Sequence, residues 1–259
     1  MKWEQLTEST TAPIRTYSDL LKFVNEHCRP YIHENPYFET NRLYRGMKTP
    51  STIASINTIR KDRLPKDTAK QVQKELDEEF ISQGFKAIRS NSMFCIGESY
   101  NAEEYGEVHV VYPMGNFEYT WSPEIRDLTV ALYNQTDASK FVPSDNKTLN
   151  VDEFPESIRI SIDARAENRG LEKLSGHIST NDLIKLYPDN VPKSISYYFS
   201  KLNLIRIDTN FSEIVKEYQT TDLVKAIVSG NEIMITGDKY LAIPFERYTE
   251  LKRYHKETK

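Results

Sequence analysis

The chain has 259 residues, 38% of them hydrophobic and 28% charged, with a formal net charge of -4, a composition typical of a soluble globular protein with a substantial core. The acidic balance argues against broad electrostatic adhesion to nucleic acid but is compatible with a local basic groove. Because no apolar run approaches the roughly 18 residues that span a bilayer and no signal peptide is recognisable, we expect a cytoplasmic protein without a membrane partner.

The N-terminal part is predicted to contain a loose arm followed by one helix. Residues 1–17 show no hydrophobic period, whereas residues 18–27 present one apolar face, with Ser18 as the expected N-cap. We expect residues 1–36 to pack, as an arm and a helix, on a main domain that spans residues 37–259.

The first strand is predicted over residues 38–47, and Arg45 lies inside it directly before Gly46. An arginine within an apolar strand costs free energy unless it meets an anion, a carboxylate or water. Arg45 is therefore either a half-exposed residue of a sheet edge or a ligand for an anion. Gly46 would allow a ligand to approach the backbone closely.

A basic, turn-like segment over residues 59–68 precedes a helix that we expect to run from Thr68 to about Gln83. The charged side chains of this segment are either a solvated surface or contacts for the phosphates of a substrate. Arg60, Lys61 and Arg63 are the residues that the second interpretation would use.

Ser90 and Ser92 open a strand that is predicted to continue to Gly97. Side chains at alternate positions of a strand point to the same side, so the two hydroxyls would face one ligand. Taken by itself this pattern is weak evidence, because serines are common at strand ends.

The middle of the chain is predicted to contain a buried strand over residues 107–113, a turn at Gly115 and a further strand ending at Trp121. Residues 135–155 are polar and read as a surface insertion, and the clean alternation of residues 157–162 predicts a half-buried strand. Three consecutive aromatic residues cannot all face a core, so one of them is expected to line a cleft or an interface: Tyr197, Tyr198 and Phe199.

Near the C-terminus, residues 222–228 are predicted to form a helix that ends at Gly230 in a left-handed cap. Residues 229–244 then read as a β-hairpin that turns at residues 236–238, with Glu232 where its first strand begins. The residues from Phe245 onward are expected to form a helical or frayed tail.

In this order, the strand arginine, the Ser-x-Ser and the glutamate resemble the signature of the toxin-like ADP-ribosyltransferases, over roughly residues 43–244. The resemblance implies an α+β fold with split mixed or antiparallel β-sheets flanked by helices, and NAD as the co-substrate. It assigns catalytic roles to Arg45, Ser92 and Glu232, and NAD contacts to Arg45, Gly46, Ser90, Ser92 and Tyr105. Contacts with the acceptor substrate are expected from Arg60, Arg63, Tyr197 and Tyr198.

The function expected from this resemblance is NAD-dependent mono-ADP-ribosylation of a macromolecule, RNA, DNA or protein, by a toxin-type enzyme with an antitoxin or inhibitory protein as a partner. Arginine is not the favoured acceptor, because family members that modify arginine carry Gln or Glu where this chain has Gly230. An NAD glycohydrolase, a catalytically silent binding module and an unrelated α+β domain are the alternatives. No metal site is expected, because the two cysteines and five histidines lack ligand spacing.

Overall fold

The computed structural model describes residues 9–48, 53–63, 70–128, 131, 141–143, 148–168, 177–179, 186, 205–207 and 211–257. The chain divides into two compact units. The first, called the sheet unit here, comprises Met1–Arg63, Asp77–Asp127 and Val215–Lys259, and the second comprises Leu64–Leu76 and Leu128–Ile214. Residues 1–36, expected as an arm and a helix packed on the main domain, fall in the sheet unit.

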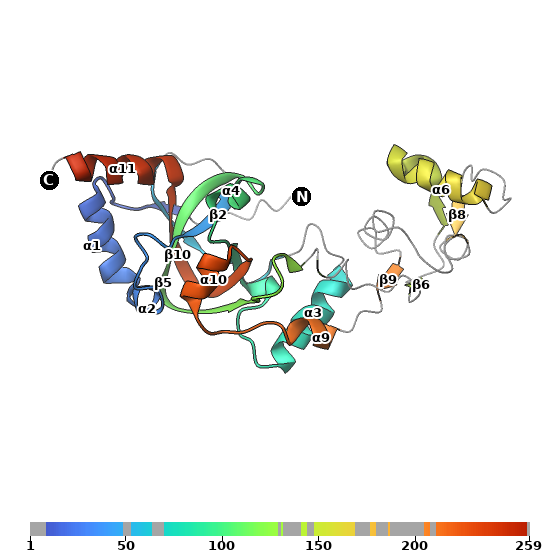
Figure 1. The fold of residues 1–259 in the computed structure, drawn as a ribbon, viewed down its shortest axis with the longest axis horizontal. Coiled ribbons are helices and arrows are strands. Elements are labelled where there is room, and N and C mark those ends of the chain that lie inside the picture. Colours follow the sequence, from blue (N-terminus) through green and yellow to red (C-terminus); the bar gives the residue numbers. More distant parts are fainter. Residues whose placement is uncertain are drawn as a thin grey trace. The chain divides into compact units, whose positions relative to one another are not determined.

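A six-stranded antiparallel sheet forms the centre of the sheet unit (Figure 1). Its two long strands, β5 (Glu107–Trp121) and β10 (Ile233–Pro244), pair along almost their whole length. The other side of β5 pairs with β2 (Leu43–Met47). The other side of β10 pairs first with β4 (Met93–Cys95) and then with β3 (Ser55–Thr58), which in turn pairs with β1 (Ser9–Thr11).

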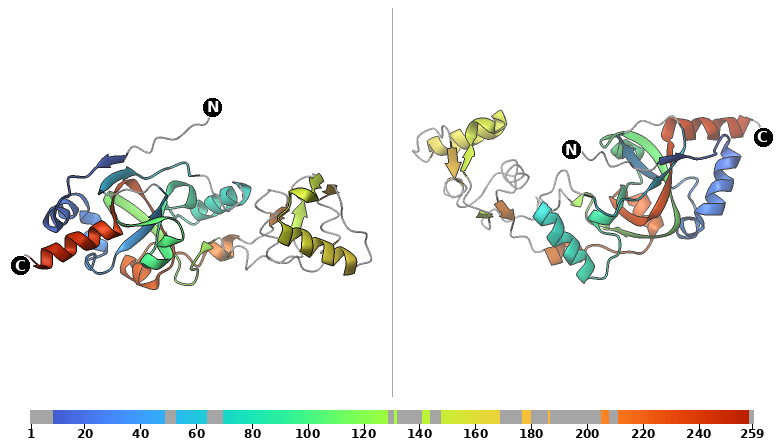
Figure 2. Two further views of the ribbon diagram at one scale, coloured as in Figure 1. Left: turned by 90° about the horizontal axis from the view of Figure 1, so that it is seen from above. Right: turned by 180° about the vertical axis from the view of Figure 1, so that it is seen from behind.

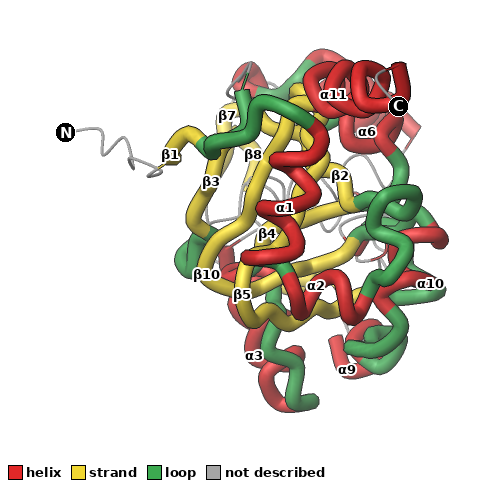
Figure 3. Tube along the Cα trace, turned by 90° about the vertical axis from the view of Figure 1, so that its left-hand side faces the viewer, coloured by secondary structure: helices red, strands yellow, loops and turns green. Residues whose placement is uncertain are grey.

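The pairing of four strands closes on itself. Strands β2, β5, β10 and β4 follow one another, and two backbone hydrogen bonds between Tyr44 and Ile96, 2.7 and 2.9 Å long, connect β2 with the residue after β4 (Figure 3). An open sheet would keep β2 and β4 apart, with β5 and β10 between them. Closure instead brings Arg45 of β2 close to Phe94 of β4.

Helices α1 (Tyr17–His27), α2 (Arg29–Glu34) and α11 (Phe245–Glu257) gather on one side of this sheet (Figures 1 and 2). Their buried aromatic and aliphatic side chains pack with those of β5 and β10 in one hydrophobic core. The remaining described helices of this unit are α3 (Lys70–Ser82, which begins in the second unit), α4 (Ser99–Glu103), α10 (Leu223–Ser229) and the 3-10 turn η1 (Arg89–Asn91). The antiparallel sheet and its helices confirm the expected α+β class.

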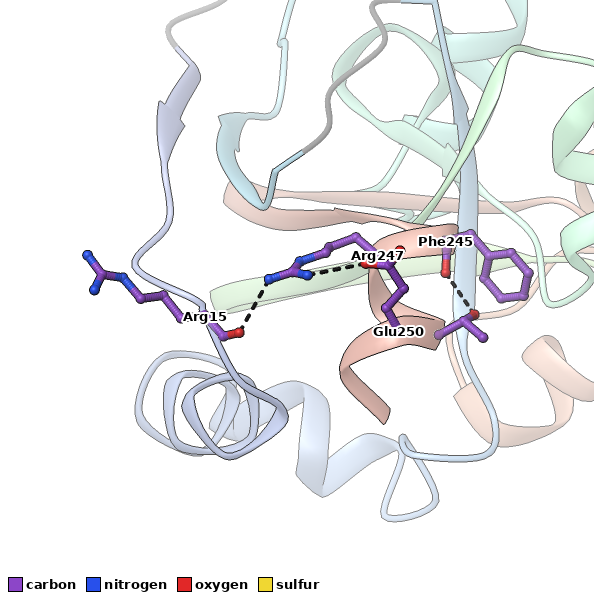
Figure 4. A network of polar contacts seen from close by, with 5 residues as sticks. Arg15, Phe245, Arg247 and Glu250 are labelled. Carbon is purple, nitrogen blue, oxygen red and sulfur yellow. Dashed lines mark hydrogen bonds and ion pairs between the residues drawn. The ribbon is translucent and has the colours of Figure 1, made fainter. Parts of the chain in front are cut away.

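The C-terminal helix α11 is anchored to the N-terminal segment rather than frayed. Arg247 forms an ion pair with Glu250 at 3.2 Å and donates a second hydrogen bond to the carbonyl oxygen of Arg15 at 3.3 Å (Figure 4). Thr249 closes the first turn by donating to the carbonyl oxygen of Phe245. The helix thereby connects the two ends of the sheet unit.

Helix α1 begins two residues earlier than predicted, because Thr16 and not Ser18 is its N-cap. The Thr16 hydroxyl accepts a hydrogen bond from the backbone N–H of Asp19, and the Asp19 carboxylate accepts one from the backbone N–H of Thr16. This reciprocal pair is a capping box. The hydrogen bond from the Thr16 backbone, with that from its hydroxyl, lowers the pKa of Asp19 below its ordinary value.

Replacing Thr16 by Ala should lower the free energy of unfolding by about 1 kcal/mol, because a helical N–H loses its acceptor. Urea denaturation measures this, with Ser18→Ala as the matched control that should cost less. Folding lowers the pKa of Asp19, so its carboxylate stabilises the folded protein at pH values above its pKa in the unfolded chain. This stabilisation is lost as the pH falls through the pKa that Asp19 has in the folded protein. An equal or larger cost for Ser18→Ala would contradict the observed cap.

Two turns that were predicted at glycines of the sheet unit are wrong, because the chain continues there as a strand. Strand β5 continues through Gly115, which adopts φ 65°, so the predicted turn is a bend within one strand. The hairpin predicted at residues 236–238 is likewise a single strand, β10, whose register with β5 shifts between Gly237 and Lys239. A Thr-Gly-Asp triplet can form a β-bulge as well as a turn, and here continuous pairing with the long strand β5 favours the bulge. The first predicted strand, residues 38–47, begins at Leu43.

Among the residues of the second unit that the structure describes are two small antiparallel strand pairs and the helix α6. Strand β6 (Phe141–Pro143) pairs with β9 (Ile205–Ile207), and β7 (Thr148–Asn150) pairs with β8 (His177–Ser179). Shorter elements are η3 (Val151–Glu153) and α9 (Phe211–Val215), the last residue of which belongs to the sheet unit. The strand predicted over residues 157–162 is wrong, because it forms part of α6 (Glu156–Asn168).

The isoleucines of α6 explain that error. Ile158 and Ile162 are buried four residues apart, as on one helix face, whereas Ile160 between them is 62% exposed. In the parts of the chain that the structure describes, no helix combines the length and the apolar character needed to cross a membrane.

Candidate functional site

Arg45 is held in place by contacts on two other strands. Its Nη1 donates a hydrogen bond to the carbonyl oxygen of Phe94 in β4, 3.0 Å away, and its side chain also hydrogen-bonds Tyr240 in β10. Burial raises the pKa of Tyr240, and the nearby Arg45 charge opposes that rise. Arg45 is half-buried, which agrees with the half-exposed residue of the first interpretation, but its side chain is anchored by contacts with β4 and β10.

Three arginines contact Phe94, two of them over its ring and one at its backbone carbonyl. The guanidinium carbon of Arg63 lies 4.0 Å from the ring centroid, that of Arg89 lies 5.3 Å away, and Arg45 binds the Phe94 carbonyl. Burial, followed by the positive charges of Arg45 and Arg89, lowers the pKa of Arg63 to about 10, while the negative charge of Glu232 acts in the opposite direction. We call these three arginines, with Phe94, the arginine cluster.

The basic segment before residue 64 is fixed beside β4 and β10. Lys61 Nζ donates to Thr236 Oγ1 at 2.9 Å and to the Gly237 carbonyl oxygen at 2.6 Å. The Arg63 backbone N–H donates to the carbonyl oxygen of Ser90 at 2.8 Å. Arg60, expected with Arg63 to contact a substrate, is exposed and forms an ion pair with Asp62 at 3.3 Å.

Glu232 stands directly before β10, after the predicted helix and its glycine cap. Gly230 adopts φ 70°, which confirms the left-handed C-cap, and the Glu232 backbone N–H donates to the Arg126 carbonyl oxygen at 3.0 Å. Burial raises the pKa of Cys95 to about 12; the Arg45 charge opposes this shift and the Glu232 charge adds to it. Arg45 and Glu232 therefore both lie within electrostatic reach of Cys95.

The sequence predicted that the two serines share one face of a strand, and this prediction is wrong. Ser90 lies in the 3-10 turn η1 and its side chain hydrogen-bonds Asp77, whose pKa is raised by burial and lowered in part by this contact. Ser92 is 2% exposed, and its hydroxyl donates to Asn91 Oδ1 at 3.0 Å. Both serines thus have partners within the protein and border the arginine cluster instead of presenting two hydroxyls together.

Two further predicted NAD contacts differ in character. A Cβ at Gly46 would lie 2.3 Å from the carbonyl oxygen of Ala102 and 2.8 Å from the nitrogen of Gly106, so packing of the chain on itself requires glycine here. Tyr105 is 55% exposed, and its pKa is raised to about 12 by burial, Asp127 and Glu232. Tyr105 is therefore close to Glu232. The predicted acceptor contacts Tyr197 and Tyr198 lie outside the described residues.

The structure brings Arg45, Arg63, Tyr105 and Glu232 into one neighbourhood. Comparisons with models of protein families, with curated proteins and with solved structures found no match to this chain. The site is therefore described by its own geometry. Sequence reasoning missed Arg89, Phe94 and Asp127. An arginine directly before the Ser-x-Ser was a signal that could have identified Arg89, but no local pattern distinguishes Asp127.

The arginine cluster should bind a polyanion, because an anion would offset the mutual repulsion of its buried and half-buried charges. Inorganic pyrophosphate at 100 times its Kd should stabilise the wild-type protein by about 2.7 kcal/mol. Arg63→Gln should remove most of this gain in a thermal unfolding titration. Arg60→Gln is the matched control, since Arg60 is exposed and paired. Equal stabilisation of Arg63→Gln and wild type would contradict an anion site at the cluster.

Proposed function

We propose that this protein is an NAD-dependent mono-ADP-ribosyltransferase with an ADP-ribosyltransferase-like fold. The observation that carries the proposal is the juxtaposition of Glu232, directly before β10, with the arginine cluster around Phe94 of β4. Cations and a carboxylate at one place suit a dinucleotide whose diphosphate is negatively charged and whose ribose becomes positively charged as nicotinamide leaves. The order of arginine, serine and glutamate along the chain is a second, independent support.

The arginine cluster would hold the diphosphate of NAD. Guanidinium groups match phosphate oxygens with paired donors, and burial strengthens such contacts relative to water. Arg63 supplies a charge that its surroundings disfavour in the free protein, so binding of the diphosphate relieves repulsion among the arginines. Arg45 is fixed by its contacts with Phe94 and Tyr240, so it would hold the bound dinucleotide in one position relative to Glu232.

Glu232 would act at the nicotinamide ribose. As the glycosidic bond breaks, positive charge develops on the ribose, and a nearby carboxylate stabilises this oxocarbenium-like state. A hydrogen bond from the ribose 2′-hydroxyl to Glu232 would strengthen as the charge grows. Ser90 and Ser92, which border the cluster, would keep η1 and β4 in place through Asp77 and Asn91.

The acceptor that we propose is a macromolecule, either nucleic acid or protein, and an inhibitory protein partner in the cytoplasm would fit a toxin-type enzyme. Incubation with NAD labelled in its adenylate part tests the activity. Label on a macromolecule supports transfer, and its loss with nuclease or with protease identifies the acceptor class. Free labelled ADP-ribose alone would instead indicate a glycohydrolase, and intact NAD after incubation with folded protein would refute both activities.

A further inference from the structure

We infer that Asp127 is a further catalytic residue, the base that takes the proton from the acceptor as ADP-ribose is transferred. This inference rests on the proposed function, and it deepens it by assigning a second carboxylate to the same site. The sequence offered no such residue, because Asp127 belongs to a short segment without a recognisable motif.

The segment that carries Asp127 is fixed directly against the segment that carries Glu232. The Asn231 side-chain amide donates to the carbonyl oxygens of Ser122 and Pro123, at 2.8 and 3.1 Å. The Glu232 backbone N–H donates to the carbonyl oxygen of Arg126, the residue before Asp127. Three hydrogen bonds therefore hold Ser122, Pro123 and Arg126 against residues 231 and 232, and Asp127 follows directly after the last of these contacts.

The charges of Asp127 and Glu232 both act on the same two tyrosines, Tyr105 and Tyr218. The Tyr105 side chain hydrogen-bonds Asp127, and after burial the charges of Asp127 and Glu232 raise the pKa of Tyr105. Burial raises the pKa of Tyr218 well above its usual value, the charges of Glu232 and Asp127 add to that rise, and Arg89 opposes it. Asp127 is itself partly exposed, and its partner Tyr105 is 55% exposed, so an acceptor can approach this carboxylate from solvent.

Glycosyl transfer gives two nearby carboxylates different tasks. The bond between the ribose C1′ and the nicotinamide nitrogen breaks, and its electron pair leaves with neutral nicotinamide. An oxygen or nitrogen of the acceptor forms the new bond to C1′, and its proton passes to the Asp127 carboxylate and then to water. Glu232 remains ionised beside the ribose, while the Tyr105 hydroxyl orients Asp127 toward the acceptor.

Two small nucleophiles separate this role from a structural one. Methanol must lose a proton when it attacks C1′, whereas azide carries none, so only methanolysis of NAD needs a base. Asp127→Asn should lower the ratio of methanolysis to azidolysis by a factor of about 10². Glu124→Gln, an exposed carboxylate on the same segment, is the matched control and should leave the ratio unchanged.

Tyr105→Phe provides a second variant that removes the hydroxyl holding Asp127 and keeps the ring. It should lower the same ratio by a factor of about ten, less than Asp127→Asn, even if the latter folds poorly. An unchanged ratio in both variants would overturn the inference while leaving the proposed function intact. Failure of the wild-type protein to release nicotinamide with either nucleophile would overturn the proposed function itself, and the role of Asp127 with it.

Discussion

Replacing Glu232 by Gln should lower the rate of nicotinamide release from NAD by a factor of about 10² to 10³, with NAD binding nearly unchanged. The amide keeps the shape and the hydrogen-bonding reach of the carboxylate but has no charge to stabilise the developing oxocarbenium ion. Binding depends instead on the arginine cluster, which the substitution leaves in place. Single-turnover release of nicotinamide, followed by chromatography, measures the rate, and calorimetry measures the affinity.

Glu246→Gln is the matched control for this experiment, because Glu246 is an exposed glutamate on α11 and the change in charge is the same. It should leave the rate at the wild-type level. A Glu232→Gln protein that releases nicotinamide as fast as the control would show that the carboxylate does not act at the ribose, and the proposed chemistry would then be wrong.

Replacing Gly97 by Ala should lower the free energy of unfolding by about 3 kcal/mol or more. A Cβ at this position would lie 1.6 Å from the carbonyl oxygen of Ile227 and 2.6 Å from its carbonyl carbon. These are backbone atoms of α10, so no side-chain rotation can relieve the overlap. Because α10 leads through Gly230 to Glu232, the same displacement should also reduce NAD turnover.

Gly84→Ala separates this steric effect from the cost of a glycine conformation. Gly84 adopts φ 89°, and a Cβ there would meet no atom within 4 Å, so only the backbone penalty of about 1–2 kcal/mol is expected. Urea denaturation of both variants gives the comparison. A cost for Gly97→Ala no larger than that for Gly84→Ala would contradict the close packing of Gly97, two residues after β4, against α10.

The elements that the sequence predicted best are those with a local chemical cause. The helix over residues 222–228 and its cap at Gly230 are confirmed as Leu223–Ser229 with a left-handed glycine, because a glycine after an apolar helical run is a strong local signal for a helix end. The hairpin failed because the partner strand β5, far away in sequence, determines whether a Thr-Gly-Asp triplet turns or bulges. The strand over residues 157–162 failed because isoleucines two and four apart fit both periods.

The site was only partly predictable for the same reason. Arg45 and Glu232 were singled out because each stands at a recognisable place in its element, and Arg63 because it belongs to a basic segment. Ser90 entered a 3-10 turn that the alternation of polar residues did not indicate. Phe94 and Asp127 join the site through the closed strand pairing and through the hydrogen bonds of Asn231 and Glu232, which are tertiary contacts without a local signal.

The most direct measurement of the central claim is a crystal structure of the protein with a hydrolysis-resistant NAD analogue. The proposal predicts that the diphosphate lies against the guanidinium groups of Arg45 and Arg63, and that the ribose 2′-hydroxyl donates to the Glu232 carboxylate. An analogue bound elsewhere, or a bound analogue with its nicotinamide ribose away from Glu232, would contradict the proposed function.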